Sequence, residues 1–422
     1  MRYRTEGGFI RIDIRYGRDG KETIDIPDEN LIGVYSPNEV KGQSADVEIR
    51  QSIDFPLDSP SIDHFLEGGE DIVFIVNDGT RPTPTAKVLE VLSHKIDLRK
   101  ARYLIATGTH RAPTEEEYGF IFGPLYPLLK GRIYCHDSLN DEFVNLGISK
   151  NGTVMEINKM AIDADRLVII TSVEPHYFAG YTGGRKSLLP GVASFKTIEQ
   201  NHKLAMKNEA QALILEGNPV HEDMMDALEA VKDKRIFSIQ AVLDKHQEVY
   251  KAASGNLKAA FLQAVKWADE VFSVTIPEKA DVVLSVAPYP MDVDLYQSQK
   301  ALDNGKWALK QGGTIVMISK CREGIGHTTF IEQLSSSPDP KKVLHDLGLE
   351  YKLGYHKAAK IAEIAVWAKI FVVSDLDPVQ IGKANMTPFP TVKSALDQIR
   401  QERPDAKILV LMDGSITVPK VM

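Results

Sequence analysis

The sequence predicts an α/β protein of two domains, each built on a mostly parallel sheet flanked by helices. Three observations predict this class. The chain has 422 residues, more than one typical hydrophobic core supports. Short apolar segments alternate with segments of helical spacing. A proline-containing break at 276–280 separates two such series, so we expect an N-terminal domain over 1–275 and a C-terminal domain over 281–412.

The first domain is expected to begin with β structure. Apolar residues alternate on both sides of Gly17-Arg18-Asp19-Gly20, a pattern typical of a hairpin. The strands that follow are expected at 71–76, 103–106 and 167–170. Helical spacing occurs at 85–92, 201–215, 220–231 and 256–272.

The second domain repeats the alternation of strands and helices. Its strands are expected at 281–286, 313–318, 370–373 and 408–412. The last residues, 413–422, are β-prone and contain Pro419, and the chain could return there to the first domain.

Composition excludes several classes of protein. Hydrophobic residues make up 43% and charged residues 26%, which is ordinary for a globular protein. A net charge of -8 without a basic run argues against nucleic acid as a partner. The apolar runs are too short to span a membrane, and the N-terminus lacks a signal peptide's apolar core. Cys135 and Cys321 lie far apart and outside any CxxC pattern, so we expect a reduced, cytoplasmic protein.

Reactive residues follow three consecutive expected strands of the first domain. The loops concerned are 77–84, 107–111 and 174–180. In open α/β sheets, ligands bind at the edge where the carboxyl ends of the strands meet. The three loops are therefore expected to line one crevice.

The first of these loops has the parts of an anion cradle. Asp78, Gly79, Thr80 and Arg81 offer backbone N–H groups, a hydroxyl and a fixed cation ahead of a helix N-terminus. The alternative is a proline-rich turn in which Asp78 serves as a cap. The segment is neither a Walker loop nor a GxGxxG motif.

The other two loops each carry a histidine, His110 and His176. An imidazole can accept or donate a proton near neutral pH. Two histidines at equivalent strand ends suit a reaction that handles a proton from either side of a stereocentre. Either one alone is as well explained by a structural role.

Two further groups could bind a cofactor. Lys186 follows a glycine-rich segment, where it could anchor a ligand covalently or bind phosphate, although most lysines are simply exposed. His202 is expected to open a helix, where its neutral ring could bind a metal or merely begin the helix.

In the second domain, Tyr296, Gln297 and Lys300 lie at the start of an expected helix. Gln297 and Lys300 are three residues apart, so they share one helix face. An amide and a cation there suit recognition of a carboxylate, and an exposed helix start is the alternative. If both domains face one cleft, this helix would close over the first domain's loops.

The motifs in this order resemble the nickel-dependent lactate racemases. The resemblance spans nearly the whole chain, and the ordered set is specific although each segment is weak alone. The segments are Asp78-Gly79-Thr80-Arg81-Pro82, Gly108-Thr109-His110-Arg111, Glu174-Pro175-His176, Gly183-Gly184-Arg185-Lys186, Asn201-His202 and Tyr296-Gln297-x-x-Lys300.

The resemblance implies a nickel-pincer nucleotide, the Ni(II)-pyridinium-3,5-bisthiocarboxylate mononucleotide, supplied by cofactor-biosynthesis proteins. His202 matches the histidine that completes a planar nickel site, a geometry that suits Ni(II). Lys186 matches the lysine joined to the cofactor through a thioamide. Residues 78–81 match the loop that contacts the cofactor.

The resemblance also implies a racemase or epimerase that inverts C2 of a small 2-hydroxy acid, lactate by default. His110 and His176 match the proton donor/acceptor pair. Arg81 and Lys300 would hold the substrate carboxylate, and Tyr296 and Gln297 would contact the substrate. A hydride would move to the cofactor and return to the opposite face of a 2-keto acid, in an active-site cleft between the domains.

One segment departs from the family pattern. A tryptophan that lines the lactate pocket is expected around 353–358, where the sequence has His356 and Lys357 instead. A basic or smaller lining could admit malate, a longer aliphatic hydroxy acid or a sugar acid.

Two other functions stay open on the residues alone. One is a nickel-free, phosphate-handling transferase or hydrolase that uses Thr80, Arg81 and Lys186, although no carboxylate cluster for Mg²⁺ accompanies that loop. The other is an anion-binding protein without catalysis. It explains a carboxylate clamp, but neither the histidine pair nor Lys186 with His202.

Overall fold

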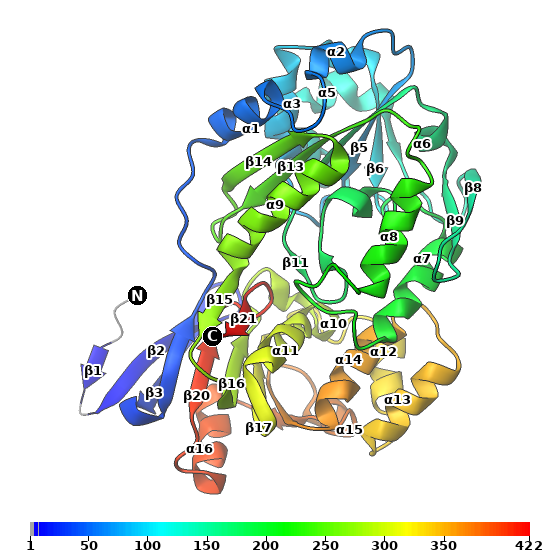
Figure 1. Ribbon diagram of the computed structural model, residues 1–422. Coiled ribbons are helices and arrows are strands. Elements are labelled where there is room, and N and C mark those ends of the chain that lie inside the picture. Colours follow the sequence, from blue (N-terminus) through cyan, green and yellow to red (C-terminus); the bar gives the residue numbers. More distant parts are fainter. Residues whose placement is uncertain (1–3, 7) are drawn as a thin grey trace. The chain divides into compact units, whose positions relative to one another are not determined.

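The computed structural model describes residues 4–6 and 8–422 (Figure 1). Contacts divide the chain into two compact units, Glu39–Val271 and Met1–Asn38 with Phe272–Met422. We call them the middle unit and the terminal unit, after their places in the sequence. The division near residue 272 lies close to the expected break at 276–280. The residues before 39 were expected in the N-terminal domain, but they group with the C-terminal part of the chain.

The middle unit is built on a six-stranded sheet with the order β14-β13-β10-β5-β6-β7. Its strands are β5 (Ile72–Asn77), β6 (Arg102–Ala106), β7 (Ile133–Cys135), β10 (Arg166–Ser172), β13 (Ile236–Leu243) and β14 (Val249–Gly255). β14 is antiparallel to β13, and the other neighbouring strands are parallel. The mostly parallel α/β sheet predicted from the alternation of elements is confirmed.

Helices cover this sheet and supply its core. They are α1 (Ala45–Asp54), α2 (Ile62–Leu66), α3 (Thr85–Ser93), α4 (Glu115–Phe122), α5 (Tyr126–Leu129), α6 (Lys159–Asp163), α7 (Phe195–Lys203), α8 (Pro219–Glu229) and α9 (Leu257–Phe272). Apolar residues of α1, α3 and α4 pack on Phe74, Tyr103 and Phe237 of the sheet in one buried cluster. Burial of these side chains, at about 25 cal/mol per Å² of apolar surface, is the main force that holds the strands in place.

Four short strands lie outside this sheet. They are β8 (Phe143–Ile148), β9 (Val154–Asn158), β11 (Pro175–His176) and β12 (Gly180–Tyr181). β8 pairs with β9, and β11 pairs with β12, so His176 lies on a two-stranded hairpin.

The prediction of a helix over 201–215 is wrong. The hydroxyl of Ser194 accepts the N–H of Thr197 at 3.2 Å, so α7 begins there and ends at Lys203. Asn201 and His202 therefore lie in the last turn of α7 and do not open a helix. The Asn201 amide donates to the Asp223 carboxylate at 3.0 Å, which ties α7 to α8 beside it (Figure 1).

The terminal unit has a fully parallel six-stranded sheet with the order β19-β18-β17-β16-β20-β4. Its strands are β4 (Leu31–Tyr35), β16 (Ala280–Val286), β17 (Leu309–Ile318), β18 (Lys369–Val373), β19 (Thr387–Phe389) and β20 (Ile408–Leu411). The expected strands at 281–286, 313–318, 370–373 and 408–412 are confirmed. The pairing of β4 with β20 explains why the start of the chain groups with this unit.

The rest of the terminal unit packs around that sheet. Its helices are α10 (Leu295–Ser298), α11 (Lys300–Gly305), α12 (Thr328–Leu334), α13 (Pro340–Leu349), α14 (Tyr355–Ala365), α15 (Pro378–Lys383) and α16 (Val392–Glu402). The expected hairpin is confirmed as β2 (Phe9–Tyr16) and β3 (Gly20–Pro27), to which β1 (Arg4–Glu6) adds. β2, β3 and α16 share a core with β16–β18 and β20. In the tail, β21 (Val418–Val421) pairs with β15 (Ser273–Ile276).

Candidate active site

The three reactive loops lie at one edge of the middle unit's sheet. β10, β5 and β6 are parallel neighbours, so the loops after their carboxyl ends meet. Two contacts join the first loop to the end of β10 and to the third loop that follows it. The hydroxyls of Thr83 and Ser172 lie 2.8 Å apart, and the Arg81 guanidinium lies 3.5 Å from the Glu174 carboxylate.

His110 is oriented by a buried carboxylate. Its Nδ1 lies 2.7 Å from Oδ2 of Asp78, while Oδ1 of Asp78 accepts the Thr80 hydroxyl at 2.6 Å. Burial opposes ionisation of Asp78, but His110, Thr80 and Arg81 together hold the pKa of Asp78 below its ordinary value. Because an ionised carboxylate only accepts hydrogen bonds, Nδ1 of His110 is the donor of this bond, and in the neutral tautomer of the ring Nε2 is an acceptor. Asp78 thus orients His110 and also caps its own turn, because Oδ1 accepts the Thr80 N–H at 3.1 Å.

His176 has the opposite hydrogen-bond arrangement. The backbone N–H of Ala179 donates to Nδ1 of His176 at 3.3 Å. In a neutral ring the proton then lies on Nε2. With both rings neutral, the sheet edge offers one imidazole whose Nε2 is an acceptor and one whose Nε2 is an N–H donor.

The ring of Phe178 is the common neighbour of three predicted site residues. Its centroid lies 4.5 Å from that of His176, 5.1 Å from that of His202 and 5.6 Å from Nζ of Lys186. Lys186 lies in the 3₁₀ turn Gly184–Ser187 and His202 in the last turn of α7. Phe178, itself 2% exposed, thus has an amine and an imidazole from separate elements packed against one ring.

Two glycines before Lys186 allow the chain to make its turn. Gly183 and Gly184 have φ values of +80° and +52°, which side chains disfavour. A Cβ on Gly183 would approach Cγ2 of Val173 to 2.5 Å, and one on Gly184 would lie 2.9 Å from the Phe261 ring. The turn is therefore packed against β10 and α9, and Lys186 has a defined position.

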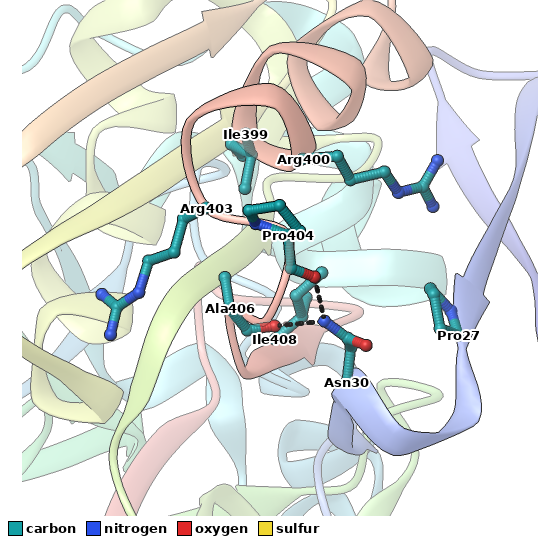
Figure 2. A pocket seen from close by; sticks show the side chains of 8 residues that line it. All are labelled: Pro27, Asn30, Ile399, Arg400, Arg403, Pro404, Ala406 and Ile408. Atoms are coloured by element: carbon teal, nitrogen blue, oxygen red, sulfur yellow. Dashed lines mark hydrogen bonds between the residues drawn. The ribbon is translucent and has the colours of Figure 1, made fainter.

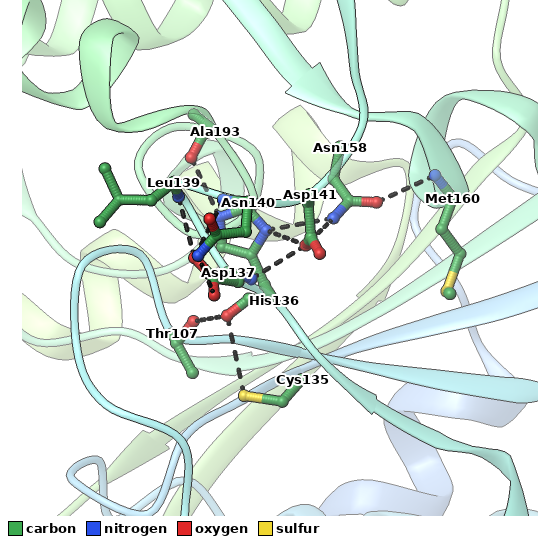
Figure 3. Close-up of polar contacts among 10 residues, drawn as sticks. All are labelled: Thr107, Cys135, His136, Asp137, Leu139, Asn140, Asp141, Asn158, Met160 and Ala193. Atoms are coloured by element: carbon green, nitrogen blue, oxygen red, sulfur yellow. Dashed lines mark hydrogen bonds and ion pairs between the residues drawn. The ribbon is translucent and has the colours of Figure 1, made fainter.

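The segment after Lys186 is joined to the His110 loop. The N–H of Gly108 donates to the carbonyl of Gly191 at 3.0 Å. Behind it lies His136, whose Nε2 donates to the Ala193 carbonyl at 3.0 Å and whose own carbonyl accepts the Thr107 hydroxyl (Figure 3). His136 thus holds the segment after Lys186 and the His110 loop together, a structural role that fits its 2% exposure.

Of the substrate residues expected in the terminal unit, Tyr296 and Gln297 lie on α10 and Lys300 begins α11, so the single expected helix is two short ones. Asp294 caps α10 by accepting the N–H of Gln297 at 2.6 Å. The ring of Tyr296 packs against His327 and Phe330, with Nζ of Lys357 3.3 Å from its centroid. Lys357 also donates to the Tyr296 carbonyl at 2.9 Å, so a nearly buried ammonium clamps this residue from two sides.

Other parts of the chain offer less chemistry. No three His, Cys, Asp or Glu side chains gather as a metal-binding cluster within residues 4–6 and 8–422. In the same range no helix is long and apolar enough to cross a membrane.

A cavity of about 170 Å³ in the terminal unit is lined by none of the predicted site residues (Figure 2). The Asn30 amide spans one side of it and donates to the carbonyls of Pro404 and Ala406.

Comparison with known proteins decides the family. Residues 16–213 match the model of the lactate racemase N-terminal domain, and residues 276–418 match that of the lactate racemase C-terminal domain. The chain belongs to the lactate racemase family. This confirms the predicted resemblance and the predicted enzyme class, an isomerase that racemises its substrate.

Relatives in the lactate racemase family match along their whole length. The lactate racemase of Thermoanaerobacterium thermosaccharolyticum is 33% identical over 96% of this chain and 98% of the relative. That of Lactiplantibacillus plantarum is 32% identical over 96% of this chain and 99% of the relative. The solved apoprotein of the Thermoanaerobacterium enzyme has a TM-score of 0.90 at 30% identity and covers 97% of this chain and 100% of its own. A Thermotoga maritima protein shares the fold, with a TM-score of 0.66, 16% identity, and coverage of 90% of this chain and 98% of its own.

Several residues around the family's motifs were not anticipated from sequence. Phe178 is the shared neighbour of Lys186 and His202, yet the sequence pattern does not distinguish it from an ordinary aromatic residue of the core. Arg185 is completely buried, which is rare for arginine and carries no local sequence signal. Gln240, on β13, accepts the Gly184 N–H at 2.9 Å from a strand with no reactive loop.

Two histidines near the site, the buried His136 and the half-buried His221, predict that stability falls in mild acid. Burial lowers the pKa of His221 to about 3, assisted by Arg185 and Lys258, and burial likewise lowers the pKa of His136. The unfolded chain takes up these protons first. Stability is therefore complete above pH about 6.5 and falls below it by up to about 1.4 kcal/mol per pH unit for each histidine.

Urea unfolding between pH 7 and pH 5 measures this slope. The His221→Gln variant keeps an acceptor for Arg185 but does not titrate, so its slope should be shallower than that of the wild type. Equal slopes would contradict the assignment of His221 as a neutral ring.

Proposed function

We propose that the protein racemises lactate by inverting C2 through a 2-keto acid intermediate. The observation that carries the proposal is the packing of Lys186 and His202 against one ring, Phe178, beside His176. The family relatives, named lactate racemases, support the same reaction. A phosphate transferase or an anion-binding protein would not need an imidazole and an amine at one aromatic ring.

The proposed cofactor is the nickel-pincer nucleotide, attached covalently through Lys186. The side chains present fit such a group. Lys186 offers a primary amine, and His202 offers a nitrogen ligand of the kind that suits planar Ni(II). Residues 78–81 offer the Arg81 cation for the nucleotide's anionic part, while the Thr80 hydroxyl donates to Asp78. When bound, the group supplies the acceptor for the substrate hydride.

The two histidines are proposed to move the hydroxyl proton. Nε2 of His110 can accept it, because Asp78 holds the ring with its proton on Nδ1. His176, with its proton on Nε2, can return one from the other side. The half-exposed His110 ring and the 6%-exposed Asp78 side chain resemble the base-and-orienter pairs of other enzymes, in which a buried carboxylate fixes the imidazole tautomer.

The carboxylate of the substrate needs cations and donors of its own. Arg81 is proposed to serve it in the middle unit, where the side chain is 30% exposed and its guanidinium lies 3.5 Å from Glu174. Tyr296 and Gln297 of α10 and Lys300 of α11 are proposed to contact the substrate from the terminal unit. We place the enzyme in the cytoplasm, because both of its cysteines are free, and we expect cofactor-biosynthesis proteins to load it.

A second candidate substrate class is a hydroxy acid with a second carboxylate, such as malate. The observation that favours it is the nearly buried ammonium of Lys357 against Tyr296, in the segment 353–358 where the resemblance predicts a tryptophan. We expect Lys357→Met to lower kcat/KM for malate at least about tenfold and to leave that for lactate within a factor of a few. Equal losses for both substrates would mean that Lys357 only holds Tyr296.

A direct assay tests the function. Protein produced with nickel and the cofactor pathway is incubated with single enantiomers of lactate, malate, longer aliphatic hydroxy acids and sugar acids, and the enantiomers are separated by chiral chromatography. Inversion of lactate or another 2-hydroxy acid supports the proposal. No inversion of any substrate by protein that carries the cofactor would overturn it.

Lys300 offers a test of substrate binding alone. We expect Lys300→Ala to raise KM about tenfold or more through loss of a charge-assisted hydrogen bond, with the cofactor content unchanged. The exposed Lys393 on α16 is the matched control, and Lys393→Ala should leave both quantities alone. Loss of cofactor from Lys300→Ala at unchanged KM would reassign this lysine to the cofactor.

A further inference from the structure

Arg185, next to Lys186, is a buried cation outside the proposed chemistry. Its side chain is 0% exposed and is the largest fully buried one in the described part of the chain. Burial of a charge is costly unless hydrogen bonds compensate for it, so such a side chain is retained for a reason. Burial also lowers the pKa of Arg185 to about 9.

The guanidinium is satisfied by neutral groups. It donates to the carbonyls of Ala179 at 2.7 Å, Thr182 at 3.2 Å and Gly183 at 3.2 Å. Its Nε donates to Nδ1 of His221 at 3.0 Å. Its plane lies 4.3 Å from the centroid of the Phe261 ring, within the range of a cation–π contact. The side chain thus acts as a bracket between α8, α9 and the turn that carries Lys186.

The carbonyls that Arg185 binds hold the backbone of Lys186. The N–H of Lys186 donates to the carbonyl of Gly183 at 3.1 Å, and Gly183 is one of the acceptors of the guanidinium. After the turn, the N–H of Gly191 donates to the carbonyl of Lys186 at 2.9 Å. Arg185 therefore fixes the acceptor on which the position of Lys186 depends, while the side chain of Lys186 reaches the Phe178 ring.

Only arginine suits this bracket. Its planar group has five N–H donors in a fixed fork, and four hydrogen bonds use them in several directions. Lysine has three donors on one nitrogen, which cannot span the same set of carbonyls. His221 accepts one of the bonds as a neutral ring, in accord with its lowered pKa.

We infer that Arg185 is a positioning residue that fixes the Lys186 turn so that the Lys186 amine can receive the cofactor. The role of Arg185 in cofactor loading rests on the proposed function. The rigidity of the Lys186 turn does not depend on the cofactor, so loading and rigidity can be tested separately.

Hydrogen exchange of the apoprotein tests the rigidity. We expect Arg185→Met to speed exchange at the amides of Lys186 and Gly191 by more than about tenfold, because the bracket's hydrogen bonds are lost. Amides of the β5 core should keep their wild-type rates. The matched control is Arg235→Met, because Arg235 also contacts an aromatic ring and a carbonyl, those of Phe65, away from Lys186.

Cofactor loading tests the purpose. We expect intact-mass spectra to show at least about tenfold less adduct on Arg185→Met than on the wild type and Arg235→Met. Arg185→Lys should also load poorly, and methylguanidinium added to Arg185→Ala during loading should restore part of the adduct. That rescue would not occur if Arg185 served only general stability.

Each outcome has a meaning. Wild-type exchange rates at Lys186, or full loading of Arg185→Met, would overturn the inference. If Arg185→Met does not fold, Arg185→Lys is measured in its place, and failure of both to fold would show a general structural role and overturn it too. Absence of an adduct on the wild type would count against the proposed function, while the exchange experiment would still decide the role of Arg185.

Discussion

Lys186→Ala is expected to abolish covalent loading of the cofactor and all racemisation with it. The Lys186 amine lies 5.6 Å from the centroid of the Phe178 ring, which also contacts His176 and His202. Protein produced with nickel and the cofactor pathway is compared by intact mass and by racemase assay. The wild type should carry an adduct on the Lys186 peptide, and the variant should show the bare polypeptide.

Two further variants define the cause of that loss. Lys196→Ala removes an exposed lysine from α7 and should load and racemise normally. Lys186→Arg keeps a positive charge but has no amine to acylate, so it should fail like Lys186→Ala. Normal activity in Lys186→Arg would show that Lys186 serves only as a cation. An adduct on another residue of Lys186→Ala would assign the anchor elsewhere.

His110→Gln and His176→Gln are each expected to lower the rate of inversion by about 10²–10⁴-fold and to leave the Lys186 adduct in place. The loss follows from removal of the group that accepts or returns the hydroxyl proton. Rates are measured in both directions, from each enantiomer, and divided by the cofactor content. Full activity in either variant would remove that histidine from the reaction.

Asp78→Asn separates orientation from proton transfer. The amide cannot hold the His110 tautomer as an ionised carboxylate does, and in a serine protease the equivalent change costs about 10⁴-fold. We expect a loss of the same order as that of His110→Gln, and no additional loss when the two are combined. His64→Gln, which changes an exposed histidine of the same unit, is the control. Additive losses would show that Asp78 acts apart from His110.

The arrangement of the three loops could be predicted from the sequence. The apolar segments around Ile75, Leu104 and Ile169 are short, buried strands with helical spacing between them. Such alternation implies parallel neighbours with their carboxyl ends at one edge. Reactive residues directly after each strand were therefore bound to meet, as they do at Asp78 and His110.

Other features depend on contacts that the sequence pattern does not encode. The helix expected from Asn201 failed because the cap at Ser194 and the tie to Asp223 place Asn201 in a last turn. The start of the chain joins the terminal unit through β4 and β20, a pairing between the two ends of the sequence. From the sequence, Arg185 is expected at the surface like most arginines, but in the structure it is buried and donates to three backbone carbonyls.

The central claim is that Lys186 and His202 hold one nickel-bearing cofactor, and nickel K-edge X-ray absorption of the loaded protein tests it most directly. The wild type is predicted to show sulfur ligands and one imidazole, and His202→Ala is predicted to lose the imidazole signal while the Lys186 adduct remains. An unchanged spectrum in His202→Ala would contradict the claim.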